Sequence, residues 1–283
     1  QNSLHFVRAL YLIVYYLLIV TEISIWTIST IYSLSSITIF MLGALLCTPW
    51  FRRNFILEKP ASYEWKRILK LSTPYFLQSM TYLVFMNIGL ILMRLFTDPQ
   101  ATGIYSAAWT LTMPLFAITA IVYQKYLLPQ YFYLATHDPT KLINTFQKFN
   151  GYMLVFGAVL ACLLYLLAPF IISIFFNAKY SEAVLVFQIL LFAIPIRFIA
   201  VNSELVLNAN GHTSTVNFGM VFSIVTIAIL SFVLVPAYSF TGAAMSYLIG
   251  EIVLLVIYFF VTYQNLYGKL IFFGWWKGFS RSK

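Results

Sequence analysis

The stretch EAVLVFQILLFAIPIRFIAVNSEL, residues 182–205, decides the fold class of this chain. An α-helix needs about 20 predominantly apolar residues to cross the hydrocarbon of a bilayer, and this stretch has that length. Arg197 nevertheless lies deep inside it. The pattern predicts a membrane-spanning helix that carries a buried charge.

The composition of the whole chain agrees with this prediction. The chain has 283 residues, 61% of them hydrophobic and 9% charged, and its mean hydropathy is +0.87. Soluble domains carry about 25% charged residues, so lipid must solvate much of this chain. The predicted fold class is an all-α polytopic membrane protein with about eight transmembrane helices. The predicted spans are residues 9–28, 31–49, 72–96, 102–128, 149–176, 182–205, 215–235 and 241–264.

The basic residues lie on one side of these spans. Most of the 17 Lys and Arg residues fall before the first span, in the links 50–71 and 129–148, and in the tail 265–283. Cytoplasmic loops of membrane proteins carry this excess, so the pattern predicts that both ends of the chain are cytoplasmic. The net charge of +9 therefore does not indicate a nucleic-acid partner. The partner that it indicates is membrane lipid.

Charged residues inside the spans are the candidates for function. A charge at mid-bilayer costs about 2.5–3.5 kcal/mol on insertion scales, so it usually faces a bundle interior or a water-filled cavity. Arg197 and Glu204 are seven residues apart and share one helix face, which Asn208 continues. Tyr247 and Glu251 share a face of the last predicted span. The candidate residues for a substrate cavity are Arg197, Glu251, Glu204, Tyr247 and Asn208.

Two interpretations of Arg197 stay open at this point. At about 1.5 Å per residue, Arg197 lies about 22 Å and Glu251 about 15 Å from the outer ends of their helices, so the two can meet. Arg197 can face a hydrophilic cavity and bind an anionic group, since its planar fork suits phosphate oxygens. It can also form a buried pair with Glu251 that holds helices together. Glu22 and Glu204 lie nearer helix ends, where hydration by interfacial water is the simpler expectation.

Motifs of soluble enzymes are missing from the sequence. There is no Gly-rich phosphate loop, no HExxH and no paired acidic cluster, so neither an enzyme nor a cofactor nor a metal is expected. The three histidines lie in or near predicted loops, and an unrecognised Ser/His/Asp arrangement stays open. Cys47 and Cys162 lie inside apolar runs without metal spacing and are expected to be packing residues.

Several stretches in order along residues 64–264 resemble one family. This part of the chain is similar to the polysaccharide-biosynthesis flippases, the O-antigen and teichoic-acid type exporters of the multidrug/oligosaccharidyl-lipid/polysaccharide (MATE-like) superfamily. The stretches that carry the resemblance are KRILKLSTPYFLQS (66–79), GIYSAAWTLTMPL (103–115), LLPQYF (127–132), LAPFIISIFFNAKYSEAVLVFQIL (167–190), AIPIRFIAVNSELVLNANGHTSTV (193–216) and VPAYSFTGAAMSYLIGE (235–251).

The resemblance implies two six-helix lobes around a central cavity with alternating access. Residues 72–264 would form the second lobe and 1–50 the last two helices of the first, joined by a cytoplasmic linker over 51–71 and followed by the basic cytoplasmic tail. About four helices of the first lobe would then precede Gln1. The implied substrate is an undecaprenyl-diphosphate-linked oligosaccharide, moved from the inner to the outer leaflet of a bacterial cytoplasmic membrane. A proton or sodium gradient would drive its transport.

One position departs from the family pattern. In many relatives an acidic residue follows Asn-Ile, but here MNIGLILMRL places Gly89 there, which puts a coupling role at that position in doubt. A MATE-type exporter of drugs or metabolites is the alternative function and would favour acidic cavity residues. A non-transporting scaffold or accessory subunit would have a dry interior with every buried charge paired.

Overall fold

The computed structural model describes residues 65–176 and 178–268, together with Trp275 and positions 34, 37–38, 41–43 and 45. The chain divides into two compact units, Gln1–Ile68 and Leu69–Lys283. In the first unit the described positions between 34 and 45 are helical. The predicted helix over 9–28, with Glu22, and most of the one over 31–49 lie outside the described residues, as does Cys47.

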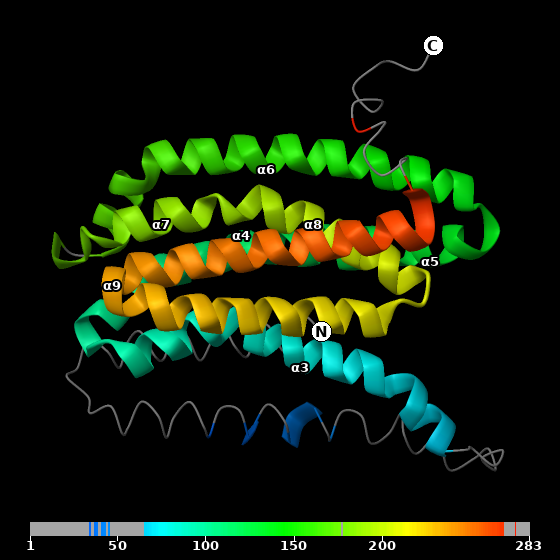
Figure 1. The fold of residues 1–283 in the computed structure, drawn as a ribbon, viewed down its shortest axis with the longest axis horizontal. Helices are drawn as coiled ribbons and strands as arrows, with labels where there is room; N and C mark the ends of the chain where they lie inside the picture. Colours follow the sequence, from blue (N-terminus) through cyan, green and yellow to red (C-terminus); the bar gives the residue numbers. More distant parts are fainter. Residues whose placement is uncertain are drawn as a thin grey trace. The chain divides into compact units, whose positions relative to one another are not determined.

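All regular elements among the described residues are helical, and no strand occurs in this part of the chain (Figure 1). Five helices in it are long and apolar enough to cross a membrane, as expected for a multi-pass membrane protein. In chain order the elements are α3 (Trp65–Phe96), α4 (Pro99–Thr119), η1 (Ala120–Leu127), α5 (Leu128–His137), α6 (Pro139–Phe175), η2 (Ala178–Tyr180), α7 (Ala183–Leu191), α8 (Ala193–Ala209), α9 (Thr213–Thr262) and η3 (Tyr263–Tyr267).

The last of these long helices is a hairpin of two antiparallel arms. Ser239, with φ 51° and ψ −130°, breaks α9 into a first arm before it and a second arm after it. The two arms then run side by side (Figure 1). A hydrogen bond joins them, from the hydroxyl of Tyr258 on the second arm to the carbonyl of Val216 on the first, at 3.2 Å. The arms correspond to the predicted helices over 215–235 and 241–264.

The predicted helix over 182–205 is confirmed as one membrane-length helical segment, Ala183–Ala209. Within it, α7 and α8 meet at a single turn residue, Phe192, whose φ of −64° and ψ of −23° remain helical. Pro195 lacks an N–H group and cannot donate to the carbonyl of Leu191, which weakens the helical hydrogen bonding one turn before the proline. Arg197 follows this point on α8.

The predicted linker over 51–71 ends differently from the expectation. Residues 65–71, which were predicted to belong to the linker, already form the beginning of α3 and continue without a break into its membrane-length part. Pro74 is accommodated inside this helix, which membrane helices tolerate. The helix predicted over 149–176 likewise begins earlier, at Pro139, where the carboxylate of Asp138 accepts a hydrogen bond from the N–H of Lys141 and caps it.

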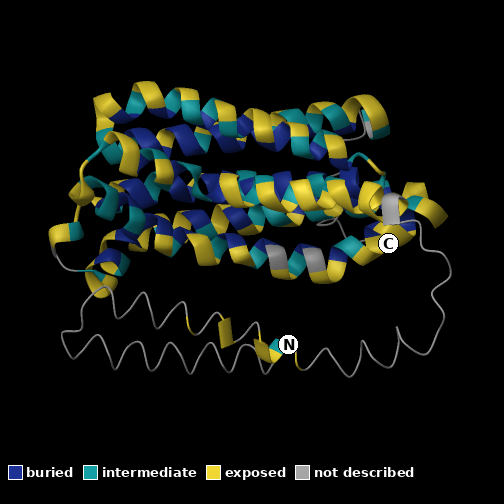
Figure 2. Ribbon diagram, turned by 90° about the horizontal axis from the view of Figure 1, so that it is seen from below, coloured by how far each residue is buried: buried dark blue, intermediate teal, exposed yellow. Residues whose placement is uncertain are grey.

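The buried apolar residues of the second unit form two clusters between its helices. The main apolar core lies between α3, α4, α6, α7, α8 and α9, and a second cluster joins η1, α5, α6 and α8. Large apolar side chains cover the outer faces, for example Leu166, which is 73% exposed, and Phe170, which is 64% exposed, so these faces suit lipid (Figure 2). Cys162 is exposed on α6, so the expectation that it packs inside the bundle is wrong.

Candidate polar site inside the helix bundle

Arg197 lies in the interior of the bundle. It follows the turn residue Phe192 between α7 and α8, and only 1% of its surface is exposed. Its neighbours along α8 are nearly all buried, so α8 is apolar around most of its circumference. A helix of this kind has no solvent face on which a charge can be placed, and Arg197 must find its partners on other helices.

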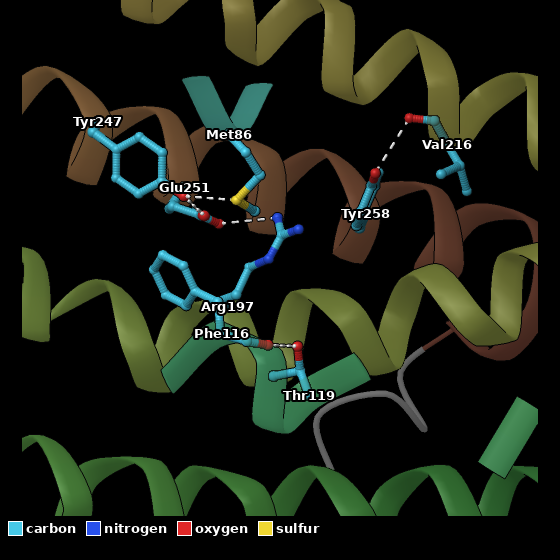
Figure 3. Close-up of polar contacts among 8 residues, drawn as sticks. All are labelled: Met86, Phe116, Thr119, Arg197, Val216, Tyr247, Glu251 and Tyr258. Carbon is cyan, nitrogen blue, oxygen red and sulfur yellow. Dashed lines mark hydrogen bonds and ion pairs between the residues drawn. The ribbon is translucent and has the colours of Figure 1, made fainter. Parts of the chain in front are cut away.

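The main partner of Arg197 is Glu251, from the second arm of α9. Nη1 of Arg197 lies 3.6 Å from Oε2 of Glu251, and the side chains are 2% and 0% exposed. The hydroxyl of Tyr247, one turn before Glu251, donates to its Oε1 at 2.7 Å (Figure 3). The Sδ atom of Met86, from α3, lies 3.9 Å from the same hydroxyl oxygen. Three of the five predicted site residues are therefore brought together: Arg197, Glu251 and Tyr247.

Aromatic rings enclose this charge pair. The guanidinium carbon of Arg197 lies 5.2 Å from the ring centre of Tyr82 and 5.3 Å from that of Phe85, both on α3. At such distances a ring face attracts a cation by about 0.5–2 kcal/mol, more where water is absent. The Tyr247 ring also lies 5.7 Å from the Phe85 ring and packs against Trp109 of α4 at 4.8 Å, both measured between ring centres.

The hydrogen-bonding capacity of this site is only partly used. Nε and Nη1 of Arg197 and Oε2 of Glu251 are buried without a hydrogen-bond partner among the described residues. At 3.6 Å the contact between the two side chains is an ion pair but is too long for a good hydrogen bond. Leaving a buried polar group unpaired costs about 1–3 kcal/mol. The unused donors of Arg197 therefore lower the stability of the fold at this point.

Glu204 belongs to the same polar region but has its own partner. It lies two turns after Arg197 on α8, where its charge attracts the guanidinium. Its Oε1 accepts a hydrogen bond of 2.8 Å from Nε2 of Gln78, on α3. Glu204 is only partly buried, so hydration near the helix end stays a prediction, but a side chain of another helix also satisfies it.

Asn208 is not part of the group around Arg197. It lies near the end of α8, about 16 Å further along the helix axis from Arg197 at 1.5 Å per residue. It is 7% exposed, and its Oδ1 has no hydrogen-bond partner among the described residues. A shared helix face therefore does not bring Asn208 to the charge pair.

Sequence reasoning missed the residues that α3 contributes. Gln78, Tyr82 and Phe85 contact Glu204 or Arg197, and their spacing of four and three residues places them on one helix face. This spacing was a usable signal, because Gln78 is one of the few amide side chains in a largely apolar span. The prediction started instead from charged residues and from the polar residues on their own helix faces.

Gly89 lies at a close approach of α3 to α4. A Cβ at this position would overlap the hydroxyl of Tyr105, a buried residue of α4. A larger residue here therefore requires the Tyr105 side chain to shift. The two acids inside the described bundle come from α8 and α9: Glu204 is partly buried, and Glu251 is fully buried.

Arg197 does not line any of the three cavities that are formed by described residues alone. One of about 180 Å³ adjoins η1 at Tyr123, a second of about 280 Å³ lies along α6 and α7 at Cys162, and a third of about 360 Å³ lies between α3 and α9 at Asn217. The observed environment of Arg197 is thus the buried pair with Glu251. A role of Arg197 in binding substrate stays a prediction. No group of three or more His, Cys, Asp or Glu among the described residues is placed to hold a metal ion.

Comparisons with family models, with curated proteins and with solved structures found no match. Function must therefore be inferred from the multi-pass helical bundle, from the buried polar site and from the resemblance in the sequence.

Proposed function

We propose that this chain is the main part of a transporter, without enzymatic activity, that moves a lipid-linked oligosaccharide from the inner to the outer leaflet of a bacterial cytoplasmic membrane. The observation that carries the proposal is the buried guanidinium of Arg197, whose Nε and Nη1 lack acceptors. An undecaprenyl-diphosphate headgroup would supply acceptors of the right kind, since phosphate oxygens match the guanidinium fork.

The loose contact with Glu251 supports an exchange of partners. A buried pair that only holds helices together gains most from short, bidentate hydrogen bonds, because these offset the desolvation of both charges. Arg197 and Glu251 are instead 3.6 Å apart at their closest and leave donors unused. In the proposed cycle the diphosphate displaces Glu251 from Arg197 when the bundle opens toward the cytoplasm.

The charge balance of the site supports coupling to a proton gradient. Glu251 pairs with Arg197, and Glu204 lies two turns further along α8 without an ion pair of its own to Arg197, so the group is one negative charge in excess when all three are ionised. An excess charge in an apolar interior is costly, and binding a proton removes it. Glu251 would take up this proton as the diphosphate claims Arg197, and would lose it when the pair re-forms.

The same charge balance favours a second candidate, a MATE-type exporter of cationic drugs or metabolites. Two acids against one base attract a cation once the interior is hydrated. The lipid-linked oligosaccharide is the stronger candidate, because the atoms left without partners include two donors of Arg197 and only one acceptor of Glu251.

The test is complementation of a flippase-deficient strain with the full-length gene, read out as surface polysaccharide. The informative variant is Arg197→Met with Glu251→Gln, which removes both charges together and so avoids leaving one of them unpaired. We expect it to reach the membrane at the normal level and to restore no polysaccharide. Glu182→Gln, at the start of α7, is the control and should complement normally.

Three outcomes would overturn the proposal. Normal polysaccharide with the double variant would reduce the pair to a structural role. Failure of the wild-type gene to complement, with efflux of a cationic dye that depends on Glu251, would assign the chain to the exporters. Neither activity from a well-expressed wild-type protein would favour the scaffold.

A further inference from the structure

Pro169 interrupts the hydrogen bonding of α6. In a continuous helix the carbonyl of Tyr165 accepts from the N–H four residues later, but position 169 is a proline and has no N–H. The neighbouring helix provides a substitute, because Nε2 of Gln188, on α7, donates to that carbonyl at 3.2 Å. The hydrocarbon of a bilayer offers no water to satisfy such a carbonyl, so this bond ties α6 to α7.

A second contact joins α6 to α8. A Cβ on Gly157 would lie 2.9 Å from Cα of Pro195, so the two helix backbones approach each other closely there. Gly157 is buried and lies about two turns before Tyr165 on α6. α6 is therefore held at two levels, against α8 at Gly157 and against α7 at Tyr165.

A cavity of about 280 Å³ lies between these two contacts. α6 lines one side of it, with Ala158, Cys162 and Tyr165 among others, and the junction of α7 with α8 lines the other side, with Phe192 and Pro195. Helices that pack against each other usually leave few voids larger than a water molecule. The junction therefore lacks packing from α6 on the side of the cavity.

The junction is also weak in its own hydrogen bonding. Pro195 cannot donate to the carbonyl of Leu191, so one helical hydrogen bond is missing where α7 meets α8. Sharp bends in helices occur mostly at such prolines. With neither this hydrogen bond nor packing from α6, the junction is the point at which the segment Ala183–Ala209 bends most easily.

We propose that the junction of α7 with α8 is a hinge. α7 and the part of α6 after Gly157 move together as one body, because the bond between Gln188 and Tyr165 joins them. This body swings against α8 about the contact of Gly157 with Pro195, and the cavity at Cys162 is the space that the movement closes and opens. The hinge does not rest on the proposed transport function, since it is observable in the protein without any substrate.

The first test follows the hinge by distances between spin labels, measured by double electron–electron resonance on the full-length protein in lipid nanodiscs. All native cysteines are replaced by serine before the labelling sites are introduced. One labelled pair spans the hinge, Phe170→Cys on α6 with Phe232→Cys on the first arm of α9, and a second pair lies within the proposed body, Phe170→Cys with Leu185→Cys on α7. All three side chains are exposed. We expect at least two distances for the first pair and a single distance for the second.

Two further variants restrict the movement in different ways. Pro195→Ala provides a donor for the carbonyl of Leu191, and Ala158→Leu fills the cavity, so each should reduce the first pair to one distance. The matched control is Val159→Leu, an exposed residue of α6 that does not line the cavity, and it should keep both distances. The hinge would be overturned by a single distance in the wild type, or by two distances that persist in both Pro195→Ala and Ala158→Leu.

The second test examines the bond that joins α6 to α7. Gln188→Leu should lower the melting temperature by about 2–4 °C in the wild-type background. It should have no measurable effect in the Pro169→Ala background, where an N–H at position 169 serves the carbonyl of Tyr165. An equal loss in both backgrounds would overturn the role of Gln188. Two distances between the labels at positions 170 and 185 would show that α6 and α7 do not move as one body.

Discussion

Nη1 of Arg197 lies 3.6 Å from Oε2 of Glu251, and this contact joins α8 to the second arm of α9 inside the bundle. Each charge is stabilised mainly by the other, since both side chains are almost completely buried and out of contact with water. Breaking such a pair from one side costs more than removing it altogether. This difference separates the structural contribution of the pair from a functional one.

The first prediction concerns this pair. Arg197→Ala should destabilise the protein by about 3–5 kcal/mol, because Glu251 is left buried without a cation. Arg197→Met with Glu251→Gln should recover most of that loss. The measurement is the free energy of unfolding of the purified full-length protein in detergent. A double variant that is as unstable as Arg197→Ala would show that the two charges do not compensate each other.

The second prediction concerns the bond between Gln78 and Glu204. Gln78→Leu should lower the free energy of unfolding by about 1–3 kcal/mol, because it leaves a partly buried carboxylate without its donor. Glu204→Gln should cost less, since the new amide oxygen still accepts from Gln78. The comparison is made by thermal unfolding of both variants. A larger loss with Glu204→Gln would mean that the charge, and not the hydrogen bond, stabilises this contact between α3 and α8.

The third prediction concerns the close approach of the two arms of α9. A Cβ on Gly242 would overlap the backbone carbonyl of Leu234, which cannot move aside as a side chain can. Gly242→Ala should therefore destabilise the protein by about 2–3 kcal/mol. The matched control is Gly103→Ala on α4, where the nearest atom, Cε1 of Tyr180, is 3.8 Å from the added carbon. It should be neutral or stabilising, because alanine favours a helix more than glycine does.

A related substitution tests the packing between the arms. A Cβ on Gly250 would meet the side chain of Ile227 instead of backbone, so Gly250→Ala should be rescued by Ile227→Ala in the same chain. Thermal unfolding of the single and double variants gives the coupling. Independent, additive effects of the two substitutions would place these residues apart and contradict the hairpin.

The fourth prediction concerns the turn of that hairpin. Ser239 has a φ of 51° and a ψ of −130°, a conformation that costs a residue with a Cβ about 1–3 kcal/mol and glycine much less. Ser239→Gly should therefore raise the melting temperature of the protein. Ser231→Gly, in the middle of the first arm, should lower it, because glycine weakens a helix interior. A lower melting temperature with Ser239→Gly would place the turn elsewhere.

The prediction of membrane-spanning helices succeeded in the described part of the chain because it needs only length and composition. The runs over 72–96, 102–128 and 149–176 each lie within a helical segment of the structure, with ends that differ by several residues. Those ends depend on local interactions such as the Asp138 cap. The single turn residue Phe192, inside the otherwise helical segment Ala183–Ala209, was not predicted, because a proline in a membrane helix indicates a distortion without specifying its position.

The polar site was only partly readable from the sequence. Arg197, Glu251 and Tyr247 stood out, since charged and polar side chains are costly in apolar spans, and the structure groups them together. The partners from α3 did not stand out in the same way. Gln78 and Tyr82 are uncharged, and nothing in their own span shows that it packs against α8.

By itself, the sequence determined that this chain is a helical multi-pass membrane protein and that a few charges are buried in it. The reason is that the free energy of transferring apolar side chains and charges into lipid is a property of each helix separately. Only the tertiary structure decided that Arg197 pairs with Glu251, that Gln78 satisfies Glu204, and that Asn208 stays apart. Those outcomes depend on which faces of different helices meet. A helix such as α8 that is apolar on nearly every side carries no periodic signal that points to its neighbours.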